Sequence, residues 1–178
     1  MTIQHRDHEF EPYITSGAIQ SRVEELGQEI GRDYSDKYPL LIGVLNGAFM
    51  FTADLMRAIT IPTEVSFVKY ASYEGTSSTG EVKALMGIRE SLEGRHVIIV
   101  EDIIDTGRTM QQLLATVKEQ NPASVAVASC LLKPEMLEKP IDIDYLGFEI
   151  PNRFVIGYGL DFDGFGRHLP DLYQLTNT

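Results

Sequence analysis

The sequence predicts an α/β fold with a mostly parallel central sheet and helices on both faces. Short apolar runs alternate with amphipathic segments along most of the 178 residues, and this alternation is typical of βαβ units. A chain of this length can bury one sizeable core. We therefore expect a single domain over residues 1–178, with a core of about 37–160 and a small hood built from 1–15 and 161–178.

The first part of the chain predicts a helix, a buried strand and a second helix. Residues 1–14 are polar and we expect them to be irregular, and Thr15 or Ser16 can cap the helix that follows. The apolar run at 40–45 predicts a buried strand, and 48–59 predicts the second helix. In the first helix, apolar side chains recur at helical spacing, at Ile19, Val23, Leu26 and Ile30.

The rest of the chain continues the alternation. The segment EGTSSTG, at 74–80, interrupts a β-rich stretch. A further helix is expected after 105–109, with one apolar face made by Met110, Leu113, Leu114 and Val117. The remaining apolar or β-rich runs predict strands at 63–73, 81–86, 96–100, 124–132 and 154–158.

The composition excludes some classes of function. The formal net charge is -11 at pH 7, whereas nucleic-acid partners favour a basic surface. Cys130 is the only cysteine and lies in an apolar run, so we expect a core residue and no intrachain disulfide. The N-terminal residues have no apolar signal-peptide segment, and no apolar run reaches the roughly 18 residues that span a bilayer. We expect a cytoplasmic protein with neither a membrane nor a nucleic-acid partner.

The most informative stretch is VIIVEDIIDTGRTM, at 97–110. An apolar strand runs into two adjacent acids, Glu101 and Asp102, and a third acid, Asp105, precedes the turn at 106–109. In open α/β sheets, ligands bind outside the carboxyl ends of the strands. These residues are therefore expected at a ligand site.

The turn suits a phosphate. The first amides of the helix that follows have no helical partner, and with the hydroxyls of Thr106 and Thr109 they can hold a phosphate dianion. Gly107 lets the backbone come close to the ligand, because it has no Cβ. Arg108 adds positive charge.

The acids need a different partner, because they would repel a phosphate. A hard cation such as Mg²⁺ and hydroxyl donors such as a ribose diol are both sensible chemically. The segment therefore predicts a site for a sugar phosphate with a metal. The alternative is a strand end whose Asp residues cap a helix and face water. The four histidines show no metal-ligand spacing.

The same stretch resembles the phosphoribosyl pyrophosphate (PRPP) signature of type I phosphoribosyltransferases. Its form EDIIDTG is close to that of hypoxanthine-guanine phosphoribosyltransferases. The resemblance continues in the expected order through most of the chain, in LNGAFMF at 45–51, SYEGTSSTGEVK at 72–83, LLK at 131–133 and GFEIPNRFVIGYGLDFD at 147–163. It implies the type I fold and a purine-salvage transferase that moves the 5-phosphoribosyl group from PRPP to N9 of hypoxanthine or guanine. The products would be IMP or GMP and pyrophosphate.

The resemblance also implies roles for the residues of this stretch. Asp105 would be the general base near the purine imidazole nitrogen. Glu101 and Asp102 would meet the ribose hydroxyls, directly or through Mg²⁺, and Asp161 would lie near a second metal. The 5′-phosphate and ribose would be held by Glu101, Asp102, Asp105, Thr106, Gly107, Arg108 and Thr109.

The other implied subsites lie elsewhere in the chain. Pyrophosphate is expected at Leu45, Asn46, Gly47 and Arg167. The Leu45–Asn46 peptide bond is often cis in the family, and many relatives have Lys or Arg in place of Asn46. Purine is expected at Lys133, Phe154, Val155 and Asp161.

Three of these roles can be stated more closely. Lys133 would contact the purine 6-oxo group, Phe154 would stack on the base, and the backbone of Val155 would bind the base edge. Judged by pattern alone, Phe154 and Val155 would be core residues and Lys133 a solvated one. Ser72 and Tyr73 would belong to a mobile loop that closes over the site and excludes water.

Other functions remain open at this point. A regulatory PRPP sensor that binds RNA or DNA would need a basic face or an added module. A transferase acting on pyrimidines or adenine is disfavoured by the LLK and FVIGYGLDFD segments. A structural or interaction protein would not explain acids at a strand end followed by a phosphate-type turn. By resemblance alone, we expect a homodimer or homotetramer.

Overall fold

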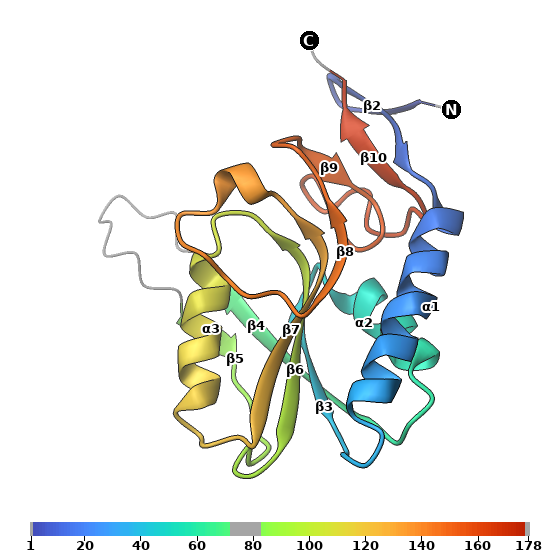
Figure 1. Cartoon of the computed structure of the whole chain (residues 1–178). Coiled ribbons are helices and arrows are strands. Elements are labelled where there is room, and N and C mark those ends of the chain that lie inside the picture. The colour runs from blue at the N-terminus through green and yellow to red at the C-terminus, as the bar shows by residue number, and fades with distance from the viewer. Residues whose placement is uncertain (1, 72–82, 177–178) are drawn as a thin grey trace.

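The computed structural model describes residues 2–71 and 83–176, which form two β-sheets and three α-helices (Figure 1). The strands of the larger sheet are Leu40–Leu45 (β3), Glu64–Ala71 (β4), Lys83–Met86 (β5), His96–Ile104 (β6), Ser124–Leu132 (β7) and Tyr145–Glu149 (β8). Their order is β5-β4-β3-β6-β7-β8. All neighbours pair in parallel except β5, which pairs antiparallel with β4 at one edge. The predicted mostly parallel central sheet is confirmed.

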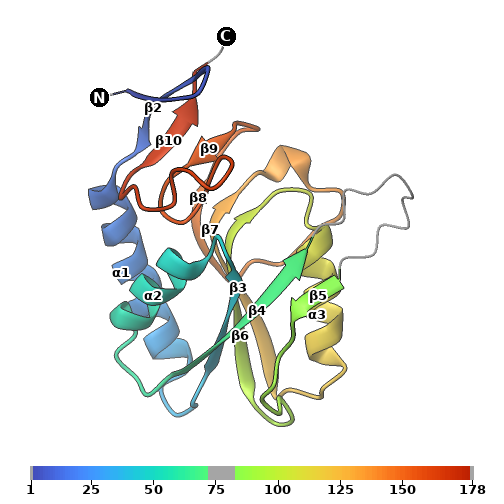
Figure 2. The ribbon, with the colours of Figure 1, turned by 180° about the vertical axis from the view of Figure 1, so that it is seen from behind.

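Helices cover both faces of this sheet, also as predicted (Figures 1 and 2). They span Ser16–Asp33 (α1), Phe49–Ala58 (α2) and Arg108–Lys118 (α3). Ile98 and Val100 of β6 pack in one core layer with α1 and α2. Val97 and Ile99 of the same strand pack in the other layer with α3. Because both faces of β6 are covered, its apolar run is continuous rather than alternating.

The local predictions for the helices hold. The Thr15 side chain accepts a hydrogen bond from the Ala18 amide (3.3 Å) and caps α1. The apolar face of α1 is buried as expected at Ile19, Val23, Leu26 and Ile30. Cys130 lies in the core, and burial raises the pKa of its thiol.

The two ends of the chain form a second sheet, which we call the hood sheet. Its strands are Ile3–His5 (β1), His8–Ile14 (β2), Val155–Ile156 (β9) and Leu172–Leu175 (β10). Their order is β1-β2-β10-β9, and all three pairings are antiparallel. Both termini lie beside this sheet, at the top of Figure 1.

Four expectations about strands need correction. Residues 1–14 are not irregular, because β2 pairs with β10 about 160 residues further along the chain. The run at 154–158 contributes β9 to the hood sheet rather than a strand to the central sheet, and β8 was not predicted. The strand expected at 96–100 continues to Ile104, because Glu101, Ile103 and Ile104 still pair with β7.

Two further strands are found near the expected places. The strand expected at 63–73 is observed as β4, and the one expected at 81–86 as β5. Residues 72–82, between these two strands in the sequence, lie outside the described residues. No helix in residues 2–71 and 83–176 has the length and hydrophobicity that crossing a bilayer would need.

Candidate functional site

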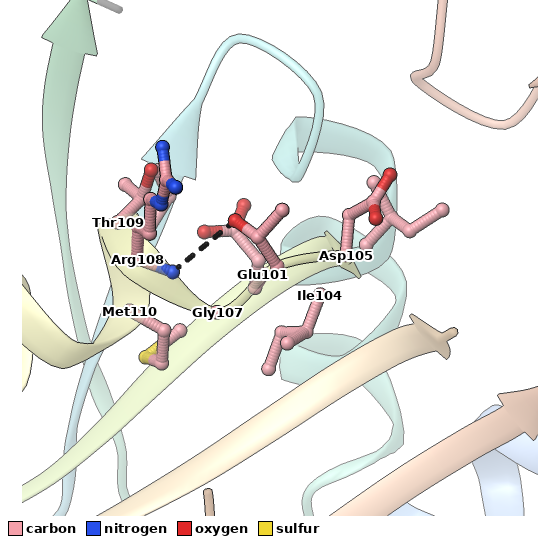
Figure 3. A pocket seen from close by; sticks show the side chains of 10 residues that line it. Glu101, Ile104, Asp105, Gly107, Arg108, Thr109 and Met110 are labelled. Atoms are coloured by element: carbon pink, nitrogen blue, oxygen red, sulfur yellow. Dashed lines mark hydrogen bonds between the residues drawn. The ribbon is translucent and has the colours of Figure 1, made fainter. Parts of the chain in front are cut away.

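The carboxyl ends of β3 and β6 and the start of α3 surround a cavity of about 230 Å³. Its lining includes Val44 of β3, Glu101 of β6 and all residues from Ile103 to Met110. Two of the three acids, Glu101 and Asp105, therefore share one cavity with the predicted phosphate turn (Figure 3). This is the edge of the sheet at which the sequence predicted a ligand site.

The turn before α3 is built around Gly107. Its φ of 81° is in the left-handed region, which favours glycine. A Cβ at this position would lie 2.4 Å from the Cδ1 atom of Ile141, so a larger residue would also displace that side chain. Within the described residues, no side chain caps α3 at this end. The Arg108 amide donates to the Thr106 hydroxyl (3.4 Å), the dashed line in Figure 3.

The Arg108 side chain has a partner that the sequence did not predict. Its guanidinium pairs with Glu138, with Nη2 2.6 Å from Oε1 and Nε 2.8 Å from Oε2. The ion pair is exposed, so it contributes little to stability. The positive charge that we expected at the phosphate turn is thus shared with Glu138.

Glu101 is a buried acid in contact with its neighbour Asp102, which is half-buried. Glu101 is only 7% exposed, and burial raises the pKa of its carboxyl well above the usual range, with the neighbouring Asp102 charge raising it further. Burial raises the pKa of Asp102 as well. Two adjacent acids that lose solvation in this way are stabilised by a bound cation or by hydroxyl donors. The pair therefore fits a divalent ion that a ligand helps to hold.

The resemblance implied two metal positions, with Glu101 and Asp102 at one and Asp161 near the other. No group of three or more His, Cys, Asp or Glu side chains that could hold a metal is found in the described part of the chain. Asp161 instead pairs with Arg167 (Oδ1 to Nη2, 2.7 Å) and accepts from the Gly164 amide (2.7 Å). Mg²⁺ commonly binds through one or two carboxylates plus substrate phosphates and water, and Glu101 with Asp102 offers two carboxylates.

The predicted pyrophosphate loop lies directly against the acid pair. The Leu45–Asn46 peptide bond is cis, as the resemblance implied. A Cβ added at Gly47 would lie 1.5 Å from Asp102 Oδ2, so only glycine leaves room for this carboxylate. Arg167 also lies near Asp102, since its charge lowers the pKa of that acid. The structure thus brings the predicted pyrophosphate residues and one predicted ribose residue together.

If this loop binds the pyrophosphate of PRPP, as the resemblance implies, Gly47→Ala should raise the KM for PRPP about 10- to 100-fold, because the added methyl group forces Asp102 or the loop to move. The measurement is steady-state kinetics at saturating purine. The matched control is Gly17→Ala, since a Cβ at Gly17 meets nothing within 4 Å. An unchanged KM in Gly47→Ala would show that the contact with Asp102 has no part in PRPP binding.

A second cavity of about 240 Å³ lies beside the first. It contains all the predicted purine residues together with two of the acids, and it is lined by Asp102, Ile103, Asp105, Lys133, Phe154, Val155, Leu160 and Asp161. Asp105 lines both cavities. A ligand that filled both would pass this carboxylate at the junction.

Lys133 is not the solvated lysine that its pattern alone indicated. The residue is 8% exposed, and its Nζ lies 3.1 Å from Asp105 Oδ2 and 3.5 Å from the side-chain oxygen of Asn152. The other oxygen of Asp105, Oδ1, is buried and has no hydrogen-bond partner among the described residues. Lys133 and Asp105 therefore both line the second cavity and form an ion pair there.

Phe154 is not a core residue, which the pattern alone favoured. It is 45% exposed and lines the second cavity, whereas Val155 is buried. Asn152 lies beside Lys133 and was missed by the sequence reasoning. Gly159 was missed too, although its Cα packs on the Gly47 carbonyl so closely that a Cβ would lie 2.1 Å from that oxygen. Ser72 and Tyr73, predicted in a mobile loop, lie outside the described residues.

Comparisons with known proteins agree with this geometry. A phosphoribosyl transferase domain matches residues 14–163. The chain is 44% identical over 170 residues to a hypoxanthine-guanine phosphoribosyltransferase of Dictyostelium discoideum, covering 93% of this chain and 94% of that protein. It is 43% identical over 175 residues to the protein of the same name from Mycobacterium tuberculosis, covering 90% and 87%.

Solved structures give the same result. A hypoxanthine phosphoribosyltransferase of Trypanosoma cruzi matches with a TM-score of 0.89 at 37% identity, over 98% of this chain and 95% of that chain. A hypoxanthine-guanine phosphoribosyltransferase of Bacillus anthracis, solved with a HEPES molecule in its active site, matches with a TM-score of 0.88 at 35% identity, over 94% and 97%.

Proposed function

The chain belongs to the phosphoribosyltransferase family, and we propose that it is a purine-salvage transferase of the hypoxanthine-guanine type. The reaction moves the 5-phosphoribosyl group from PRPP to N9 of hypoxanthine or guanine and gives IMP or GMP and pyrophosphate. One observation carries this proposal: Asp105 lines both cavities and lies 3.1 Å from the Lys133 ammonium. The carboxylate thus stands between a turn suited to a phosphate and a cation suited to a 6-oxo group.

The ribose phosphate fills the first cavity in this proposal. The 5′-phosphate accepts hydrogen bonds from the amides of the turn at 106–109 and from the Thr106 and Thr109 hydroxyls. Glu101 and Asp102 accept from the ribose hydroxyls. The amides and the acids thus bind different groups of the ligand, so the acids can lie in the same cavity without repelling the phosphate.

The pyrophosphate of PRPP lies at the loop of Leu45, Asn46 and Gly47, opposite Arg167. Asn46 carries no charge, so backbone groups and the Arg167 guanidinium provide the contacts. We propose Mg²⁺ at Glu101 and Asp102, where it supplies positive charge to the departing pyrophosphate. Asp161 acts by holding Arg167 rather than as a third ligand in the protein (2.7 Å).

Asp105 acts as the general base. The purine nitrogen attacks the anomeric carbon from the face opposite pyrophosphate, the carbon–oxygen bond to pyrophosphate breaks, and Asp105 accepts the proton that the imidazole ring loses. Lys133 holds the Asp105 carboxylate through Oδ2, at the place where Asp105 lines both cavities. Positioning and electrostatics then account for most of the catalysis.

Selection for a 6-oxopurine follows from Lys133. An ammonium donates hydrogen bonds and has no acceptor, so it pairs with the 6-oxo group but not with the 6-amino group of adenine. Phe154 stacks on the base, and the Val155 backbone binds the opposite edge. The mismatched buried polar groups make rejection of adenine large.

A panel of bases tests the proposal. The protein is incubated with PRPP and Mg²⁺ and with hypoxanthine, guanine, xanthine, adenine or uracil, and nucleotide formation is followed. We expect IMP and GMP, and a rate with adenine at least about 10²-fold lower. EDTA should abolish the reaction, and added Mg²⁺ should restore it. No product from any 6-oxopurine would refute the proposal, and product from uracil or adenine alone would assign another transferase.

The assembly and the compartment are also proposals. In the T. cruzi relative, the C-terminal region has a role in the oligomeric state and the enzymatic activity. Near the C-terminus of this chain, Leu172–Leu175 forms β10 of the hood sheet. We propose a homodimer or homotetramer that works in the cytoplasm. Sedimentation velocity measures the oligomeric state directly.

A further inference from the structure

The predicted base-stacking residue Phe154 belongs to a group of aromatic rings from both ends of the chain. We call this group the hood ring cluster. His5, His8 and Phe10 come from β1 and β2, and Phe162 and Phe165 come from the segment between β9 and β10. We call the second cavity, where the purine is proposed to bind, the purine cavity, and the first the phosphate cavity. The ring contacts among these residues connect the purine cavity to the hood sheet.

Phe154 contacts two members of this cluster. Its ring meets Phe162 edge to face, with ring centroids 5.6 Å apart and an interplanar angle of 84°. Its ring also meets Phe10, with centroids 6.4 Å apart. Phe10 and Phe162 contact each other at 6.2 Å, so the three rings form a closed triangle. Such geometry is favourable for aromatic pairs beyond the burial of their area.

The Phe154 side chain depends on these neighbours because burial alone does not fix it. The residue is 45% exposed, whereas Phe10 is 0% exposed. The Phe154 carbonyl accepts from the Leu175 amide (2.9 Å), which fixes the backbone but leaves the ring free to rotate. A cavity of about 140 Å³, lined by His8, Phe10, Phe154, Phe162 and Leu175, lies behind the ring. Loss of Phe162 or Phe10 would enlarge this cavity and give the Phe154 ring room to turn into it.

We propose that Phe162 and Phe10 are positioning residues that hold the Phe154 ring against the purine. The inference rests on the proposed function and deepens it, since it assigns purine affinity partly to residues that do not line the purine cavity. Phe154 lines the purine cavity, whereas the phosphate cavity is lined by β3, β6, the turn and α3. Substitution of Phe162 or Phe10 should therefore raise the KM for the purine and leave the KM for PRPP nearly unchanged.

The first test is Phe162→Leu, which removes the edge-to-face contact and keeps an apolar side chain. We expect the KM for hypoxanthine and for guanine to rise about 3- to 10-fold, and the KM for PRPP to change less than about twofold. The matched control is Phe165→Leu in the same turn, whose ring contacts His5 and His168. It should leave the purine KM within about twofold of wild type. An equal rise in the control would mean general loosening of the hood sheet and would overturn the proposal.

A double-mutant cycle shows whether Phe162 acts through Phe154. Phe154→Leu alone should raise the purine KM, and Phe162→Leu should add little in that background, because the ring that it positions is gone. Equal fold-changes in both backgrounds would contradict the proposal. If Phe162→Leu does not fold, as judged by circular dichroism, Phe10→Leu in the same cycle gives the same test. An inactive wild-type protein would instead refute the proposed function, so the two failures are distinguishable.

Discussion

Asp105→Asn is expected to lower kcat by about 10²- to 10⁴-fold with hypoxanthine and with guanine. The asparagine side chain keeps the shape of the carboxylate and can still accept from Lys133, but it cannot take a proton. In the native protein, Oδ2 is held by Lys133 at 3.1 Å. The buried Oδ1 has no hydrogen-bond partner in residues 2–71 and 83–176. The substitution should therefore slow the chemical step, which lowers kcat.

Two measurements separate this role from a structural one. Steady-state kinetics give kcat, and isothermal titration gives the Kd for PRPP with Mg²⁺, which should stay within a few-fold of wild type. The control is Asp163→Asn, the same chemical change in an exposed carboxylate that pairs with Arg6. If Asp105→Asn weakens PRPP binding as much as it lowers kcat, Asp105 is a structural residue rather than the base.

Lys133→Met is expected to lower kcat/KM for hypoxanthine about 10- to 100-fold, which corresponds to the loss of a hydrogen bond to a charged group. Methionine has a similar length and no charge, so the purine cavity keeps its volume. Lys133 is nearly buried and lies beside Asp105. Part of the loss therefore comes from Asp105, which keeps its charge without its partner.

The pattern across substrates identifies the role of Lys133. In Lys133→Met, kcat/KM should fall strongly for 6-oxopurines and only slightly for adenine. The ratio of kcat/KM for hypoxanthine to kcat/KM for adenine should therefore decrease. The KM for PRPP should change much less than the KM for hypoxanthine. Lys118→Met, at an exposed position at the end of α3, is the control. An equal fall in kcat/KM for hypoxanthine and adenine would mean that Lys133 does not distinguish the substituent at position 6 of the purine.

The parts of the fold that the sequence predicted are those that local patterns determine. The stripe of apolar residues in α1 and the continuous apolar runs of β3, β6 and β7 each carry their signal within one element. The phosphate turn was equally local, since its acids, glycine and hydroxyls lie within nine residues at 101–109. The ligand site predicted from this segment therefore coincides with an observed cavity.

The parts that were missed depend on contacts far apart in the sequence. β2 has its register set by β10, with Ile14 opposite Leu172, and no pattern in residues 1–14 shows this partner. The acid pair lies within β6 rather than beyond it, because β7 extends the pairing to Ile104. The same reason explains the missed site residues, because Asn152 and Gly159 matter only through the residues that folding brings beside them.

The most direct test of this account is a crystal structure with IMP, Mg²⁺ and pyrophosphate. We predict the 5′-phosphate on the amides of the turn at 106–109, the ribose hydroxyls at Glu101 and Asp102, and the 6-oxo group within hydrogen-bond distance of Lys133 Nζ. A nucleotide phosphate bound away from this turn, or a base that does not contact Lys133 and Phe154, would contradict the account.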